Sequence, residues 1–186
     1  RVAGLDDSLY KHDGNITKKE VRAVTISKLM PMRGALLWDV GLGCGSVAIE
    51  WMRAGHDCRA IGIEPKKKRR ELAMKNALTL GTPKLSIIKG SAPDALDNLE
   101  RPDAIFIGGG FNQSTFDICW RELKPFGRIV VNAVTLETEA ELLKLKETQG
   151  GELCRISIQR SEAIGNRTGW RPLMQVTQWS KIKDAW

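Results

Sequence analysis

A short glycine-rich segment carries the strongest chemical signal in the sequence. Asp39 is followed by three glycines at alternate positions, Gly41, Gly43 and Gly45. Glycines let a backbone turn tightly and approach a ligand closely. Where such a turn opens a helix, the first backbone N–H groups lack helical partners and can donate to ligand oxygens. The segment therefore predicts a binding site, although helix–strand packing alone could also require these glycines.

A second acidic residue strengthens this interpretation. Glu64 ends the next predicted strand, where its carboxylate can accept hydrogen bonds from both hydroxyls of a ribose. The spacing G-x-G-x-G is one residue shorter than the dinucleotide fingerprint G-x-G-x-x-G, and Asp39 is no part of that fingerprint. An aspartate there can engage an ammonium group, directly or through water. A nucleoside bearing an ammonium group therefore fits better than a nicotinamide dinucleotide.

Two alternating patterns surround this loop and must position it. Short apolar runs predict buried strands at 36–40, 59–63, 84–88, 103–107 and 127–133. Other stretches predict helices at 18–29, 46–54, 66–80, 93–99, 111–123 and 136–148. Thr17 and Glu20 resemble a capping box that would open the first of these helices. The alternation predicts right-handed βαβ units and a parallel sheet with helices on both faces.

The last part of the chain departs from this alternation. Residues 152–160 and 173–179 both read as strands, and the segment 161–172 between them is a polar, basic loop. Consecutive strands joined by a loop form an antiparallel pair. The predicted fold class is α/β: a Rossmann-like, mostly parallel sheet of seven strands with a C-terminal antiparallel hairpin. This arrangement and the glycine motif resemble class I methyltransferases, which bind S-adenosylmethionine (SAM).

The resemblance to class I methyltransferases suggests roles for two further segments. Ser91 and Ala92 follow the third predicted strand, where such proteins contact the adenine. Gly108, Gly109 and Gly110 follow the fourth strand and would leave a wide floor for a bulky methyl acceptor, unless they form a plain βα turn. The candidate cofactor-binding residues are Asp39, Gly41, Leu42, Gly43, Cys44, Gly45, Glu64, Ser91 and Ala92.

Length and composition limit the organisation of the chain. Its 186 residues suit a single domain, with an N-terminal segment and helix at 1–30, a βα core at 36–150 and a C-terminal hairpin at 151–186. No apolar run is long enough for a membrane span. The chain starts with Arg1 rather than Met, which suggests a domain cut from a longer polypeptide.

Charge and cysteine content narrow the function classes. Lys and Arg number 29 against 22 Asp and Glu, and the net charge of +7 favours an anionic partner. The four cysteines lack the spacing of a zinc or redox site, so we expect reduced thiols in a cytoplasmic protein and no metal. The two histidines, His12 and His56, do not sit in a context that suggests a metal site or a Ser/His/Asp triad.

Several segments resemble one methyltransferase family more closely. They are Gly4-Leu5-Asp6-Asp7, the run from His12 to Thr25, Leu37 to Gly41, Gly45 to Trp51, the glycines 108–110 and Trp179. The chain resembles the decarboxylating precorrin methyltransferases of cobalamin biosynthesis over nearly its whole length. That family comprises the C-terminal domain of precorrin-6Y C(5,15)-methyltransferase and the single-domain C(15)-methyltransferases. The Thr-Lys-x-Glu-Val-Arg segment is far more specific than the glycine loop.

This resemblance implies methyl transfer from SAM to carbon 15 of a precorrin, with loss of carbon dioxide from the ring C acetate. It implies SAM contacts at Thr17 as well as at the glycine loop, Glu64 and Ala92. Leu42 and Cys44 stand where smaller residues are expected, but the backbone does the binding there. The family also implies a tetramer and, in its two-domain form, a linked N-terminal domain for methylation at carbon 5.

The substrate of that family is a polycarboxylate tetrapyrrole, which basic side chains can bind. We expect this role for Lys18, Arg22, Arg167 and Arg171, together with the glycines 108–110, whereas the basic run 66–70 reads as a solvated face. No catalytic residue can be named, since an electron-rich ring carbon needs positioning more than a strong base. A tRNA or rRNA methyltransferase and a non-catalytic SAM-binding subunit remain the alternatives.

Overall fold

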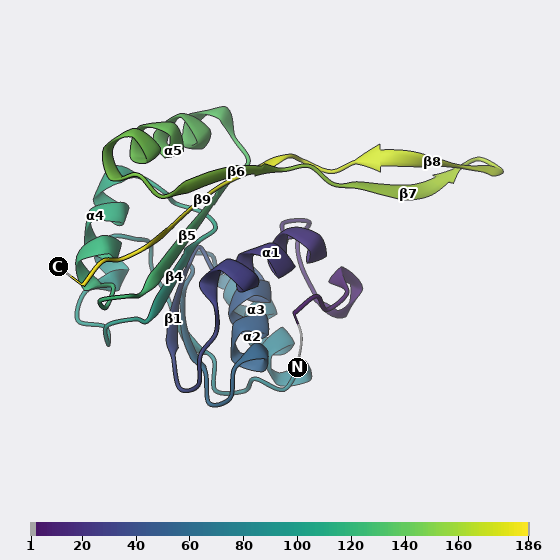
Figure 1. The fold of residues 1–186 in the computed structure, drawn as a ribbon. Helices are drawn as coiled ribbons and strands as arrows, with labels where there is room; N and C mark the ends of the chain where they lie inside the picture. The colour runs from purple at the N-terminus through teal and green to yellow at the C-terminus, as the bar shows by residue number, and fades with distance from the viewer. Residues whose placement is uncertain (1–2, 186) are drawn as a thin grey trace.

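The computed structural model describes residues 3–185 and is built around one twisted sheet (Figure 1). Its strands are β1 (Leu36–Val40), β2 (Arg59–Ile63), β3 (Ser86–Ile88), β4 (Ala104–Ile107), β5 (Arg128–Ala133), β6 (Glu152–Ile156) and β9 (Val176–Ile182). The strand order is β3-β2-β1-β4-β5-β9-β6. The first five strands pair in parallel, and β9 runs antiparallel to both β5 and β6. The predicted seven-stranded, mostly parallel sheet is confirmed.

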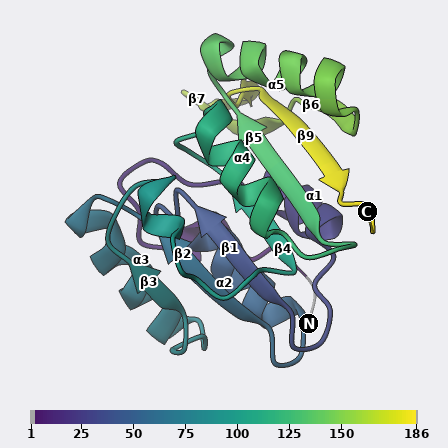
Figure 2. The ribbon, with the colours of Figure 1, turned by 90° about the vertical axis from the view of Figure 1, so that its left-hand side faces the viewer.

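Helices cover both faces of this sheet. The helices are α1 (Lys19–Leu29), α2 (Ser46–Ala54), α3 (Lys67–Thr79), α4 (Gln113–Glu122) and α5 (Leu136–Gln149), with short 3-10 turns at Asp7–Leu9 and Asp94–Leu96. Helices α1, α2 and α3 lie on one face, and α4 and α5 lie on the other (Figures 1 and 2). Within residues 3–185, no helix combines the length and apolar character that crossing a membrane requires.

The central strands form because both of their faces are buried. Every residue of β1 and of β4 is buried, as the continuous apolar runs of a doubly covered parallel sheet predict. Alternate residues serve the two cores: Trp38 and Ile105 pack with α4 and α5, whereas Leu37 and Phe106 pack with α1, α2 and α3. The strands thereby hold the loops at their carboxyl ends in fixed positions.

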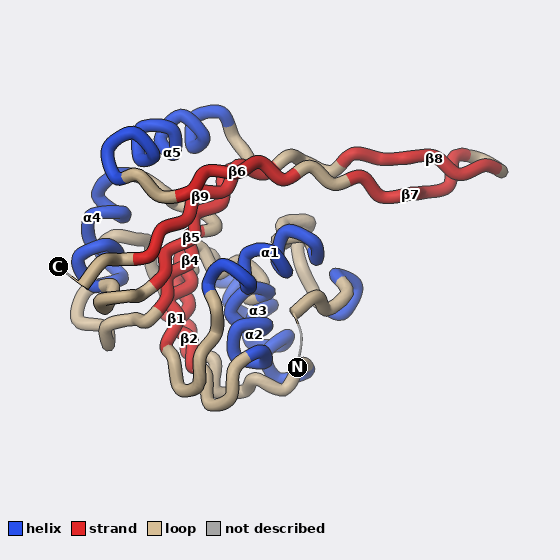
Figure 3. The backbone as a smooth tube through the Cα atoms, viewed as in Figure 1, coloured by secondary structure: helices blue, strands red, loops and turns tan. Residues whose placement is uncertain are grey.

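The predicted loop at 161–172 is wrong. The structure forms a second, two-stranded sheet there, with β7 (Gln159–Ile164) antiparallel to β8 (Arg167–Pro172). This β7–β8 ribbon extends from the ends of β6 and β9 well beyond the main body (Figure 3). Most of its residues are exposed on both faces. An exposed ribbon lacks the alternation of apolar and polar residues that reveals a half-buried strand, so its residues resemble those of a loop.

Two local predictions are also corrected. Lys18, not Thr17, caps α1, and no side chain closes a capping box there, because Glu20 instead pairs with Arg160 of the ribbon at 2.5 Å. The helix predicted at 93–99 is only the 3-10 turn Asp94–Leu96. Tertiary contacts override a local capping pattern in the first case.

Candidate active site

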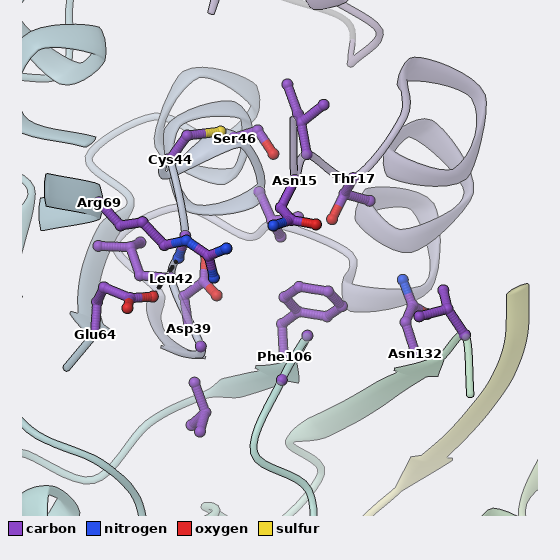
Figure 4. A pocket seen from close by; sticks show the side chains of 18 of the residues that line it. Asn15, Thr17, Asp39, Leu42, Cys44, Ser46, Glu64, Arg69, Phe106 and Asn132 are labelled. Atoms are coloured by element: carbon purple, nitrogen blue, oxygen red, sulfur yellow. Dashed lines mark hydrogen bonds between the residues drawn. The ribbon is translucent and has the colours of Figure 1, made fainter. Parts of the chain in front are cut away.

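A cavity of about 610 Å³ opens at the carboxyl ends of β1, β2, β4 and β5 (Figure 4). Residues 14–18, which precede α1, form one wall, and the base of the β7–β8 ribbon contributes Ile158, Leu173 and Met174. The cavity lies where β1 and β4 are neighbours and the chain connections diverge, which is the usual ligand position in open α/β sheets.

The glycine loop between β1 and α2 forms the floor of this cavity. Gly41, Gly43 and Gly45 have φ angles of 78°, 57° and 83°, a region that side chains other than glycine rarely adopt. A Cβ on Gly41 would lie 2.8 Å from the backbone nitrogen of Gly109, so the loops after β1 and β4 touch through glycine alone. A Cβ on Gly45 would meet Ala73 of α3 at 3.2 Å. Gly45 therefore serves the turn and the helix packing.

Asp39 places a buried carboxylate beneath the loop. Its Oδ2 accepts a hydrogen bond of 3.1 Å from the backbone N–H of Ala48, whereas Oδ1 is buried and has no partner among the described residues. Burial is the main cause that raises the pKa of this carboxyl to about 8; the Ala48 N–H lowers it in part, and the nearby Glu64 carboxylate adds a smaller increase. An unpartnered buried acceptor is costly unless a ligand satisfies it.

Glu64 follows β2 and is also buried. Its Oε2 accepts from the backbone N–H of Gly43 at 2.9 Å, and its Oε1 accepts from the backbone N–H of Lys66 at 3.0 Å. These two amides fix the carboxylate at the cavity wall. Each carboxylate oxygen can accept a second hydrogen bond, so the group retains capacity for ligand hydroxyls.

The other predicted cofactor residues gather at the same place. Thr17, Leu42, Cys44, Ser91 and Ala92 line the cavity together with Asp39, Gly41, Gly43 and Glu64. Gly45 lies behind the lining, against α3. The structure therefore brings all of the predicted cofactor residues except Gly45 to the lining of one cavity, and their contacts with a cofactor stay a prediction.

The predicted substrate residues divide into two groups. Gly108, Gly109, Gly110 and Lys18 line the cavity. Arg171 pairs with Glu162 at 2.8 Å on the exposed ribbon, and Arg167 lies beside the ribbon's turn, so the structure places both away from the cavity. The substrate-binding role predicted for these two arginines is not supported. The ribbon carries them outward, which a short loop would not do.

Arg22 is a further correction. Its side chain is fully buried, and its Nε donates to Glu50 Oε1 at 2.6 Å. Its remaining nitrogens donate to Asp7 and to the carbonyl oxygens of Thr17 and Leu5. Arg22 therefore holds the N-terminal segment in place rather than facing a ligand.

The sequence predicted a solvated face for the basic run 66–70 and did not predict that two of its residues line the cavity. Lys66 and Arg69 both line the cavity, and Arg69 donates from Nε to Asp13 Oδ2 at 2.8 Å. That ion pair connects α3 to the segment that leads into the wall at 14–18. The available signal was the position of the run directly after Glu64, at the start of a helix beside the predicted site.

Other lining residues carried no chemical signal in the sequence. Phe106 near the end of β4 and Asn132 on β5 both line the cavity (Figure 4). Apolar side chains complete the wall, namely Val134, Ile158, Pro172, Leu173, Met174 and Val176. In the described part of the chain, no group of three or more His, Cys, Asp or Glu residues is arranged to hold a metal ion.

Comparison with known proteins places these features in a family. A family model described as a precorrin methyltransferase domain matches residues 8–183. This chain belongs to the precorrin methyltransferase family. The match covers both the cavity and the strands that carry it.

Individual relatives agree with that assignment. A Sinorhizobium protein named precorrin-6Y C(5,15)-methyltransferase [decarboxylating] is 50% identical over 98% of this chain, which spans 44% of that protein. A Saccharolobus solfataricus protein, named as a probable cobalt-precorrin-6B C(15)-methyltransferase (decarboxylating), is 35% identical over 80% of this chain and 78% of its own length. The chain thus spans about half the length of the curated precorrin-6Y relatives that it matches.

A solved structure shows the same architecture. The C-terminal domain of precorrin-6Y C5,15-methyltransferase from Rhodobacter capsulatus superposes with a TM-score of 0.91 and 46% identity, over 98% of each chain. More distant neighbours include a SAM-dependent O-methyltransferase from Thermotoga maritima, with a TM-score of 0.74 and 20% identity. The fold is therefore that of the class I SAM-dependent methyltransferases.

Proposed function

We propose that this chain is a SAM-dependent methyltransferase that methylates carbon 15 of a precorrin-7-type tetrapyrrole and removes the ring C acetate carboxyl as carbon dioxide. The proposal places the chain in cobalamin biosynthesis. The family match over residues 8–183 carries it, and the names of the relatives supply the substrate class and the decarboxylation.

Several features of the cavity support SAM binding. The unpartnered Asp39 Oδ1 offers an acceptor for an ammonium group, since it is buried at the end of β1. The open space in front of Gly43 admits a ligand chain against the backbone. Glu64 would accept from the ribose hydroxyls, and Ser91 and Ala92 would contact the adenine. Thr17 would close the site from the N-terminal wall.

Bound SAM supplies an electrophilic methyl group, and the chain's own residues must bring the ring carbon into line with it. A Cβ at Gly109 or Gly110 would meet nothing within 4 Å, so these glycines leave a wide floor for the macrocycle. The apolar residues Val134, Leu173 and Met174 can cover a ring face and exclude water. Lys18 would pair with a substrate carboxylate. The conjugated macrocycle itself accepts the electrons released on decarboxylation.

The direct test incubates the chain with SAM and precorrin-7 and follows product mass. The expected product has gained one CH₂ unit and lost one CO₂, with one S-adenosylhomocysteine (SAH) formed per product. Asp39→Ala serves as the inactive control, because it removes the ammonium acceptor. Methylation without CO₂ loss would overturn the decarboxylating role. Methyl transfer to tRNA in place of the precorrin would overturn the substrate class.

Three wider features belong to the same proposal. The precorrin-6Y relatives are about twice as long as this chain, which supports a linked domain for methylation at carbon 5. Four free cysteines support a location in the reducing cytoplasm. The family resemblance supports a homotetramer. An RNA substrate has weaker support, since the RNA methyltransferase neighbours are 16–17% identical and share the fold alone.

A further inference from the structure

Asn132 occupies a distinctive position in the cavity wall. It lies on β5 one residue beyond the Ile107–Val131 pair, and therefore beside Gly108 at the floor expected to face the methyl acceptor. Figure 4 shows Phe106 between Asp39 on one side and Asn132 on the other. Asn132 is thus a polar side chain on the part of the cavity away from the predicted ammonium site.

A buried hydrogen-bond network holds the Asn132 amide. Gln178, its cross-strand partner on β9, donates from Nε2 to Asn132 Oδ1 at 2.8 Å and to Thr25 Oγ1 at 3.1 Å. Asn132 Nδ2 donates to the same Thr25 Oγ1 at 3.3 Å. Thr25 and Gln178 are fully buried, so water does not compete for these groups. The network ties β5 and β9 to helix α1.

The donors and acceptors of this network follow from one fixed point. The backbone carbonyl oxygen of Val21 can only accept, so the Thr25 hydroxyl, 2.8 Å away, must donate to it. Thr25 Oγ1 is then left as an acceptor, and both Gln178 and Asn132 must turn their NH₂ groups toward it. The second N–H of Gln178 donates to Asn132 Oδ1, which fixes that atom as the oxygen.

These donor and acceptor assignments leave one N–H of Asn132 without a partner among the described residues. Asn132 Nδ2 carries two hydrogens, and only one is used on Thr25. Rotating the amide would place its NH₂ against the NH₂ of Gln178 and lose two buried hydrogen bonds. The second N–H of Asn132 is therefore available to the cavity as a donor. Thr25 and Gln178, which do not line the cavity, fix which end of the amide carries it.

We propose that Asn132 determines acceptor specificity by donating this free N–H to a carboxylate oxygen on a side chain of the tetrapyrrole. The inference rests on the proposed function and names a recognition group within its acceptor site. Lys18 lines the same cavity and adds a positive charge suited to the same ligand. The exposed apolar side chains of Val134 and Met174 provide the surface on which a macrocycle would rest. Thr25 and Gln178 act as positioning residues, through Asn132.

The test measures tetrapyrrole binding separately from turnover. Uroporphyrin III, a stable tetrapyrrole whose side chains are all acetates and propionates, is titrated by fluorescence in the presence of SAH. Asn132→Asp replaces the donor with an acceptor and should weaken binding by about 10- to 100-fold. Asn132→Ala should weaken it by about tenfold. SAH affinity should stay within about twofold, which also shows that the variants are folded.

Matched variants separate this role from general charge and packing effects. Asn98→Asp makes the same charge change at an exposed site that follows the 3-10 turn Asp94–Leu96. This variant should bind uroporphyrin as the parent does. Thr25→Val should weaken uroporphyrin binding because it removes the shared acceptor, and Thr25→Ser should restore it. Unchanged binding by both Asn132 variants would overturn the proposal. The parent chain could also fail to methylate precorrin-7 while the Asn132 variants still bind uroporphyrin more weakly than the parent does. That combination would support the donor role and overturn the proposed reaction.

Discussion

Replacing Asp39 with asparagine should make this protein more stable at neutral and alkaline pH while impairing its ligand binding. The carboxyl is buried, has one unpartnered oxygen, and has a pKa raised from an ordinary 3.8 to about 8. The folded chain therefore binds this proton more tightly than the unfolded chain does. The stability that this protonated carboxyl contributes is fully present below about pH 4 and is lost progressively as the pH rises toward 8.

The size of the effect follows from the pKa difference. At about 1.4 kcal/mol per pH unit, ionising Asp39 in the folded chain costs up to about 6 kcal/mol at alkaline pH. Asparagine carries no charge, but its NH₂ group would take the place of the unpartnered oxygen, at a cost of about 1–3 kcal/mol. We therefore expect Asp39→Asn to be more stable than the parent by about 3 kcal/mol at pH 9.

Urea unfolding from pH 5 to pH 9 measures this effect. The free energy of unfolding of the parent should fall by about 1.4 kcal/mol per pH unit relative to the variant until the pH reaches about 8. SAH affinity should behave in the opposite way: it should rise about tenfold per pH unit up to pH 8 in the parent and stay low and flat in the variant. Parallel stability profiles for the two proteins would show that Asp39 is already ionised at low pH and would refute the reasoning.

Three further predictions test other parts of the site. Glu64→Ala should weaken SAH binding by about 1–3 kcal/mol in a calorimetric titration, and unchanged affinity would rule out its ribose role. Glu50→Ala leaves the Arg22 charge buried without its main partner and should lower the free energy of unfolding by about 3–5 kcal/mol in urea; a loss below about 1 kcal/mol would contradict this. Arg160→Ala separates the ribbon base from Asp7 and Glu20 and should raise the KM for the tetrapyrrole without changing SAH affinity. Arg171→Ala, which removes an exposed pair on the same ribbon, is its control, and equal KM values for the two would refute the role of Arg160.

The sequence determined the sheet and the residues that we propose hold the nucleoside, because both depend on local patterns. Central parallel strands are buried on both faces, so they appear as continuous apolar runs, and β1 and β2 were predicted with the observed bounds. Glycines at alternate positions and an acidic residue at each of two neighbouring strand ends are also local signals. The carboxyl ends of parallel strands lie at one edge of the sheet. Residues at these ends therefore lie close together once the strands pair as neighbours.

Tertiary structure decided which basic residues line the cavity. From the sequence we expected Arg22 to bind a substrate carboxylate and the run containing Arg69 to be a solvated face, yet Arg22 pairs with Glu50 inside the protein and Arg69 lines the cavity. Arg22 pairs with Glu50, which is 28 positions away in the chain, and Arg69 pairs with Asp13, which is 56 positions away. No local spacing records such distant pairings.

The acceptor end of the site was likewise decided by packing across the sheet. In the sequence, Asn132 is a single polar residue in an apolar strand and carries no functional signal. In the structure, β9 places Gln178 opposite Asn132, and α1 brings Thr25 within hydrogen-bonding distance of both. The antiparallel insertion of β9 beside β5 makes that contact, and it also carries the ribbon base to the cavity wall. The sequence thus predicted the residues that we propose hold a nucleoside, whereas the pairing of distant strands decided which side chains form the remaining wall.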